Sequence, residues 1–461
     1  MSDVSAVLTK KDYLGEAKRL SDGSVKEFDR KVWYKVLYVF LIILSSIGEW
    51  TRLNVILAGL PKAITAGVIA LAFLCFLLSN DLDLVKSFVK PYMAYVSLIL
   101  VIMLWSLIIW VLDFTSFSSI IRGGSKMAFQ LVSITAAVCA VYIFGQRAVY
   151  LLFLGLSIMN GTIMLLEMPN YGVGESLRSL WVCVSTFGTA EGYARSLEIH
   201  DVTFLFGQFI IYFLLFAPRG TEKEKKERRF GIIVSIFFFA VGLKRVAVIA
   251  IVASLIYGFI VLRRKNITKI VITGGVLWFL FLFVYLYSVR TGSFIRLMDK
   301  VNFDMMGREY IWELAKKYYR FEPSYMGLGF EAVDAIVKGW YESGILTHAY
   351  PFHNDILKVF VELGFPGFCL WAGITYIVYP VFFCKHFSPK AGVLYMSLLT
   401  YMTFTYMTDN TAFYFWCTMG LRLIPLAYAF GTTKHEKVEK RWSAPDKGEM
   451  QRQIKSLIYQ T

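Results

Sequence analysis

Twelve apolar runs, most of them about as long as a bilayer is thick, constrain this chain more than any other feature. A helix needs about 20 predominantly apolar residues to cross the hydrocarbon core. Only 18% of the 461 residues are charged, whereas soluble chains carry nearer about a quarter. We therefore predict an all-α, polytopic membrane protein with about twelve transmembrane helices. The runs lie near residues 33–49, 59–79, 91–112, 127–145, 148–166, 201–217, 230–243, 246–262, 270–288, 366–384, 391–408 and 412–430.

The distribution of lysine and arginine predicts the orientation of these helices. Both tails, residues 1–32 and 431–461, are basic, and so are the interior segments 222–229 and 263–265. Loops rich in Lys and Arg face the cytoplasm, and an even number of crossings places all four segments there. The first 30 residues are polar, which differs from a cleaved signal peptide. We predict that both termini are cytoplasmic.

The same distribution limits the partners that the net charge of +15 could imply. Basic residues concentrated in tails and short loops fit anionic lipid headgroups and argue against nucleic acid. The six cysteines show no Cys-x-x-Cys spacing and fall mostly inside apolar runs. We therefore expect no zinc site and no disulfide framework.

The predicted crossings divide the chain into five parts. These are a cytoplasmic tail (1–32), transmembrane helices one to nine (33–288), a large external loop (289–365), helices ten to twelve (366–430) and a second tail (431–461). Long loops are usually functional or disordered. The large loop is rich in Trp, Tyr and Phe, so we expect it to be ordered and helical.

Lys244 and Arg245 lie in the external turn between two short crossings. Basic residues on this side oppose the usual bias. They could extend their charged ends to lipid phosphates, or they could bind an anionic substrate. The sequence leaves both interpretations open.

Arg308 begins a second segment of interest, residues 307–319. Ile311, Leu314 and Ala315 recur at helical spacing, which predicts an amphipathic helix. A helix N-terminus favours anions, and a guanidinium group binds phosphate oxygens in pairs. Arg308 could therefore hold a phosphate, or it could pair with a nearby carboxylate such as Glu309 or Glu313.

The third segment, residues 351–367, predicts a helix on the outer surface that turns into the bilayer. Asn354 is a good N-cap, and Gly364, Pro366 and Gly367 should break the helix. Its polar face carries Asp355, Lys358 and Glu362. His353 directly precedes this helix and could act as a general base for a sugar hydroxyl, although a lone histidine is more often a core or surface residue.

These segments resemble the O-antigen ligase and polymerase superfamily of bacterial envelopes. The signature is His353-Asn354, nine residues, then Gly364-x-x-Gly367. Gly307-Arg308-x-x-x-Trp312, Pro323 followed by Gly327-x-Gly329, and the turn at Arg245 also resemble that family. Lys244 stands where members usually have Ser, so Arg245 alone carries the match there. The close similarity covers about residues 240–410, and the first 200 residues agree only in their pattern of crossings.

The resemblance implies a metal-independent glycosyltransferase of the GT-C type in the bacterial inner membrane, with its active site on the external face and no cofactor. The donor would be a glycan on undecaprenyl diphosphate. His353 would deprotonate the acceptor hydroxyl, and Arg245, Arg308 and Lys244 would hold the diphosphate. Residues expected to support the site or bind the acceptor are Asn354, Glu362, Asp409, Arg290 and Arg320.

The acceptor remains open at this point. A polymerase for O-antigen or capsule joins repeat units on the lipid carrier, and we favour it, whereas a ligase transfers the glycan to lipid A core. The resemblance also leaves open whether a chain-length regulator binds the enzyme. A twelve-helix transporter or flippase is the alternative from another class, but we find no internal repeat and few charges at mid-membrane, where such proteins place them.

Overall fold

The structure, a computed structural model, describes residues 32–48, 50, 60–79, 82–113, 117–186, 191–197, 199–242, 245–301, 305, 307–347 and 351–442. Every regular element in these ranges is helical, as the sequence predicts. The α-helices are α2 (Val32–Ile47), α4 (Leu60–Ser79), α5 (Leu82–Leu112), α6 (Phe117–Phe144), α7 (Arg147–Tyr171), α8 (Val173–Thr186), α9 (Gly192–Ser196), α10 (His200–Leu215), α11 (Glu222–Val241), α12 (Arg245–Val261), α13 (Ile267–Arg290), α14 (Ser293–Lys300), α15 (Arg308–Ala315), α16 (Ala332–Glu342), α17 (Asp355–Gly373), α18 (Tyr379–Phe382), α19 (Pro389–Tyr406) and α20 (Phe415–Trp442). A 3₁₀ turn, η1 (Lys316–Tyr318), and two π-helical turns, η2 (Ile374–Val378) and η3 (Phe383–Phe387), complete the set.

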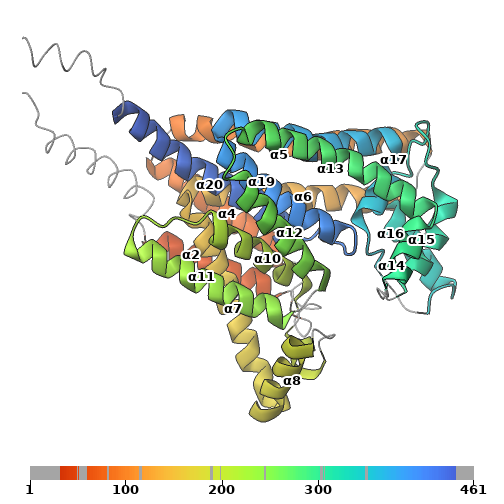
Figure 1. The fold of residues 1–461 in the computed structure, drawn as a ribbon, viewed down its shortest axis with the longest axis horizontal. Coiled ribbons are helices and arrows are strands. Elements are labelled where there is room, and N and C mark those ends of the chain that lie inside the picture. Colours follow the sequence, from red (N-terminus) through yellow and green to blue (C-terminus); the bar gives the residue numbers. More distant parts are fainter. Residues whose placement is uncertain are drawn as a thin grey trace, which may run out of the picture.

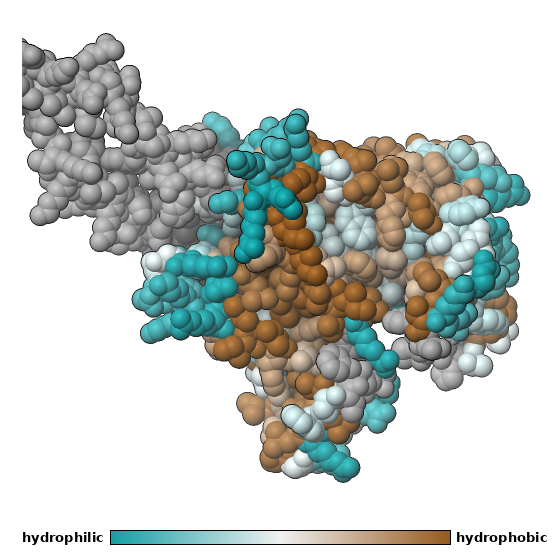
Figure 2. All heavy atoms as spheres, viewed as in Figure 1, coloured by the Kyte–Doolittle hydropathy of each residue, from teal (hydrophilic) through white to brown (hydrophobic). Residues whose placement is uncertain are grey.

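Five of the described helices are long and apolar enough to cross a membrane. Figure 2 shows an apolar surface over the middle of the bundle, with hydrophilic residues gathered toward its two ends. The described part of the chain is therefore all-helical and compatible with a polytopic membrane protein, and the count of twelve crossings stays a prediction. The five helices are Leu84–Leu112, Phe117–Phe144, Arg147–Tyr171, Ile267–Arg290 and Asp355–Phe387.

The predicted large loop folds into three short helices, α14, α15 and α16, which cluster at one end of the bundle (Figure 1). We call this the loop end. The turn of residues 407–414, between α19 and α20, also lies there, because its Asn410 binds the backbone just before α17. The segment between α7 and α10 contains α8 and α9, and Figure 1 shows α8 standing away from the bundle.

Helix α17 is interrupted at Gly364, where the sequence predicts a break. Gly364 has φ 65°, and the chain resumes a helical course beyond it. The break leaves backbone carbonyl and N–H groups of α17 without partners in the helix, and the loop before α16 forms hydrogen bonds with them. The N–H of Gly329 donates to the Glu362 carbonyl at 2.8 Å, and the N–H of Phe365 donates to the Tyr325 carbonyl at 2.7 Å. The break in α17 is thus the place where the large loop is fastened to the bundle.

Glycine is required at this junction because two backbones touch. A Cβ atom on Gly327 would lie 2.4 Å from the Glu362 carbonyl oxygen. A Cβ atom on Gly364 would lie 2.1 Å from the backbone of Met326. Both glycines also have positive φ angles, which other residues rarely adopt. The two glycine motifs in the sequence therefore form the two sides of one contact.

Candidate active site

His353 occupies a strained position directly before α17. Its φ is 51°, in the left-handed region that costs a non-glycine residue free energy. Its backbone N–H donates to Oδ1 of Asn410 at 3.0 Å, which holds this conformation. The side chain is 23% exposed. Strain of this kind concentrates at functional sites, and here the surrounding turn enforces it.

Asp409 lies beside the His353 ring. Its Oδ1 is 3.4 Å from Nδ1 of His353, and the carboxylate is almost wholly buried. The same oxygen accepts a hydrogen bond from the N–H of Asn410 at 2.8 Å. A carboxylate at Nδ1 orients an imidazole, stabilises its protonated form and leaves Nε2 to accept a proton. The contact is at ion-pair distance and is not a hydrogen bond, because Nδ1 of His353 has no hydrogen-bond partner among the described residues. His353 is therefore a candidate base with a neighbouring acid.

Asn354 fixes the start of α17, as predicted. Its Oδ1 accepts from the N–H of Leu357 at 2.9 Å, which confirms the N-cap. Its Nδ2 donates to the hydroxyl of Tyr285 at 2.8 Å. That hydroxyl donates in turn to the Met407 carbonyl at 3.2 Å. Asn354 is fully buried and connects α17 to α13 and to the turn that carries Asp409.

Arg308 is the first residue of α15, and its N-cap Gly307 has φ 79°. No described ion pair joins Arg308 to Glu309 or Glu313, although all three residues lie in the described part of the chain, and Glu313 pairs with Lys316 instead. The carboxylate alternative is therefore not observed. The helix is tied to the histidine segment, since Trp312 Nε1 donates to the carbonyl of Phe352 at 3.2 Å.

Arg245 is exposed at the start of α12, and the turn before it contains Lys244, which lies outside the described residues. Arg290 donates to the Lys316 carbonyl at 2.5 Å, and its guanidinium lies 5.0 Å from the centre of the Tyr319 ring. These contacts hold the end of α15 against α13. Arg320 is exposed in the loop that follows. No contact among the residues that the structure describes brings Arg245, Arg290 or Arg320 to His353, and their binding roles stay predictions.

The expectation that the first part of α17 lies on the outer surface is wrong, because the whole segment Asp355–Gly364 is buried. Its polar face meets charges from other helices rather than water. Lys358 Nζ lies 2.8 Å from Asp334 and 3.2 Å from Glu331, and Glu362 lies 4.0 Å away. We call Lys126, Glu331, Asp334, Lys358 and Glu362 the ionic cluster.

Lys126 of α6 completes the ionic cluster from the far side, 2.6 Å from both Glu331 and Asp334. Burial alone would raise the pKa of Asp334, but the ammonium groups of Lys358 and Lys126 outweigh it and hold the pKa below its usual range. Sequence reasoning missed Lys126, Glu331 and Asp334. Only the spacing of four residues between Lys358 and Glu362 could have indicated one of these ion pairs from the sequence.

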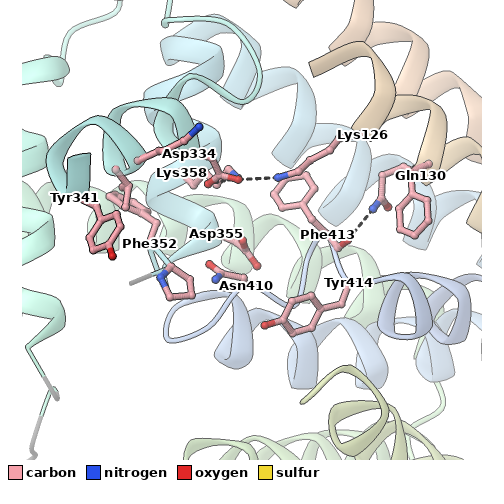
Figure 3. Close-up of a pocket in the computed structure, with 14 residues that line it drawn as sticks. Lys126, Gln130, Asp334, Tyr341, Phe352, Asp355, Lys358, Asn410, Phe413 and Tyr414 are labelled. Atoms are coloured by element: carbon pink, nitrogen blue, oxygen red, sulfur yellow. Dashed lines mark hydrogen bonds and ion pairs between the residues drawn. The ribbon is translucent and has the colours of Figure 1, made fainter. Parts of the chain in front are cut away.

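A pocket of about 450 Å³ opens beside the histidine segment. Figure 3 shows Asp355 and Asn410 close together in this pocket, with Tyr341 and Phe352 on one side and Phe413 and Tyr414 on the other. Asp355 is fully buried, and its Oδ2 accepts from the N–H of Ala412 at 2.7 Å. Its Oδ1 has no hydrogen-bond partner among the described residues.

The family comparison covers the histidine and all four candidate arginines. No curated protein matches the chain. The O-antigen ligase family model matches residues 230–372, a stretch that begins in α11 and ends in α17. It contains Arg245, Arg308 and His353, and it stops before Asp409. This match supports the resemblance of residues 230–372 to the O-antigen ligase and polymerase superfamily.

Proposed function

We propose that this protein is a bacterial polysaccharide polymerase that joins oligosaccharide repeat units carried on undecaprenyl diphosphate at the external face of the plasma membrane. The observation that carries the proposal is the strained His353, held 3.4 Å from a buried Asp409 beside a pocket at the loop end. The family match supports glycosyl transfer in general. O-antigen and capsule repeat units are both consistent with this chemistry.

The reaction requires one bond to form and one to break. The acceptor hydroxyl oxygen attacks the anomeric carbon of the donor sugar, and the bond from that carbon to the diphosphate oxygen breaks. His353 Nε2 takes the hydroxyl proton, and Asp409 stabilises the imidazolium that forms. The electron pair of the broken bond leaves with the diphosphate. A positioned general base contributes about 10²- to 10⁴-fold to such a step.

Arginine can stabilise the leaving group. A diphosphate is already a good leaving group, so fixed positive charge can stabilise the charge that develops on it. Arg308 supports this role because it begins a helix whose free N–H groups also favour anions and because it pairs with neither Glu309 nor Glu313. Arg245 joins it in the proposal as the other arginine in a motif that resembles the family.

A ligase is the second candidate, because the matching family model is described as O-antigen ligase. It would use the same donor, base and arginines, and would transfer the glycan to a sugar of lipid A core. The two candidates differ only in the acceptor. Chain length on the carrier therefore distinguishes them.

The test is glycan analysis in a deletion strain of the source bacterium. The strain is complemented with wild type, His353→Ala, Arg308→Ala or the control Arg296→Ala, an exposed arginine whose contacts are local to α14. We expect single repeat units on the carrier for His353→Ala and Arg308→Ala, at normal protein levels by immunoblot, and long chains for the control. Long carrier-linked chains that fail to reach lipid A would establish the ligase instead. Normal glycan in both variants would refute the site.

A further inference from the structure

We infer that the pocket beside His353 binds the terminal sugar of the acceptor glycan, which assigns Asp355 and Tyr341 to acceptor recognition. The inference rests on the proposed function and deepens it. The residues that could hold the diphosphate of the donor were foreseen from the sequence. For the acceptor we expected supporting or binding roles for Asn354, Glu362, Asp409, Arg290 and Arg320. Tyr341 and Asp355 were not assigned this role from the sequence, because the pocket is assembled from α6, α16, α17 and the turn before α20.

The position of the pocket is the first argument. Phe352 and Asp355 line it, and they flank His353 and Asn354 in the chain. Asn410 also lines it, binds the His353 backbone and follows Asp409. A sugar in this pocket would thus lie beside the base that must take the proton from its hydroxyl.

The chemistry of the lining is the second argument. Asp355 presents a buried oxygen without a partner among the described residues, and such an oxygen is costly unless a ligand binds it. A sugar hydroxyl can donate to that oxygen. Tyr341 and Tyr414 line the pocket on two sides (Figure 3), and aromatic rings can pack against the apolar side of a pyranose ring. The volume of about 450 Å³ lies within the range of about 300–1,000 Å³ found for ligand pockets.

The charges that line the pocket favour a sugar of the acceptor over the diphosphate of the donor. Asp334 and Asp355 face the pocket, and its lysines are already engaged. Lys126 and Lys358 pair within the ionic cluster, and Lys338 lies 3.4 Å from Glu342. Neither Arg245 nor Arg308 lines the pocket. A diphosphate would therefore meet carboxylates without a free guanidinium, whereas uncharged hydroxyl groups suit this surface.

The experiment separates the two substrates. Lipid-linked repeat units extracted from the deletion strain serve as donor. Repeat oligosaccharide released from the carrier by mild acid, and labelled with a fluorophore at its reducing end, can act only as acceptor. Purified full-length protein is assayed for elongation of the labelled oligosaccharide, with each substrate varied in turn. The variants are Tyr341→Ala, Asp355→Asn and the control Tyr310→Ala. Tyr310 is exposed to a similar extent as Tyr341, on α15, and does not line the pocket.

We expect Tyr341→Ala and Asp355→Asn to raise the KM for the labelled acceptor by about tenfold and to leave the KM for the donor unchanged. Tyr310→Ala should match wild type. Equal changes in both KM values, or none, in an active enzyme would overturn the pocket assignment alone. So would polymer on the carrier without any elongation of the labelled oligosaccharide. A wild-type enzyme that makes no polymer from the extracted donor would instead refute the proposed function, and the inference with it. Tyr341 is on the surface, so its variant tests the pocket even where Asp355→Asn fails to fold.

Discussion

Two polar clusters meet at the start of α17, and they differ in how completely their charges are paired. In the ionic cluster, Lys358 is almost wholly buried and contacts three carboxylates within 4.0 Å. The pair of His353 and Asp409 is looser, with 3.4 Å between the nearest atoms and a histidine that is partly exposed. A fully paired cluster fixes structure. A cluster in which a histidine nitrogen can accept a proton and which lies beside a pocket can take part in a reaction.

Backbone strain alone does not separate the two clusters. The non-glycine residues with positive φ in the described part of the chain are Glu331, at 71°, and His353, at 51°. One belongs to the ionic cluster and the other to the candidate active site. The side chain of Glu331 is held by Lys126 and Lys358, whereas His353 is held through its backbone, and its ring has Asp409 on one side and is partly exposed. Access to the side chain therefore decides which strained residue is functional.

Replacing Asp409 with Asn should have the largest effect of the three substitutions. It removes the negative charge beside His353, while the side chain keeps its shape. An amide cannot stabilise the imidazolium that forms on His353, so kcat should fall by about 10²-fold or more. Resistance to heating in detergent should stay near wild type. The measurement pairs elongation rates with size-exclusion profiles after heating. A variant that loses heat resistance in step with activity would assign Asp409 to structure.

The sequence predicted the local features of this region well. The Asn354 cap, the helix that begins at Arg308 and the break at Gly364 depend on residues within a few positions of one another, and the structure confirms each. It also predicted the class of the fold, because apolar runs need a lipid environment wherever they pack.

The burial of Lys358 and Glu362 was not predicted, and the reason is physical. Helical periodicity assigns a charged face to solvent unless opposite charges cover it. The covering charges come from residues remote in the chain, and Lys126 and Asp334 are 208 positions apart. The pocket is assembled in the same way, from α6, α16, α17 and the turn at Asn410. Only the tertiary arrangement brings these residues together.

Replacing Lys358 with Met should lower stability rather than the activity of the folded protein, which is the opposite of the result expected for Asp409→Asn. The substitution leaves buried carboxylates facing a single ammonium group, and removal of one partner of a buried ion pair costs about 3–5 kcal/mol. We expect much less folded protein after heating, together with lower expression. Whatever protein folds should retain an acceptor KM close to wild type if the pocket keeps its shape. A heat-stable Lys358→Met enzyme without activity would make Lys358 part of the reaction and erase the distinction between the two clusters.

Replacing Lys126 with Ala should have the smallest effect, because this side chain is 42% exposed whereas Lys358 is 5% exposed, and solvent screens the more exposed charge. The control is Lys338→Ala, which removes a more exposed lysine from the same region.

The pKa of Asp334 is held below its usual range, so the stability linked to its charge is present above the ordinary value of about 3.9 and is lost only as the pH falls further. The small difference between Lys126→Ala and wild type should therefore stay constant from about pH 8 to about pH 5. Thermal unfolding in detergent across that interval measures it. A difference that shrinks as the pH falls toward 5 would mean that a carboxylate with a higher pKa, rather than Asp334, is the main partner of Lys126.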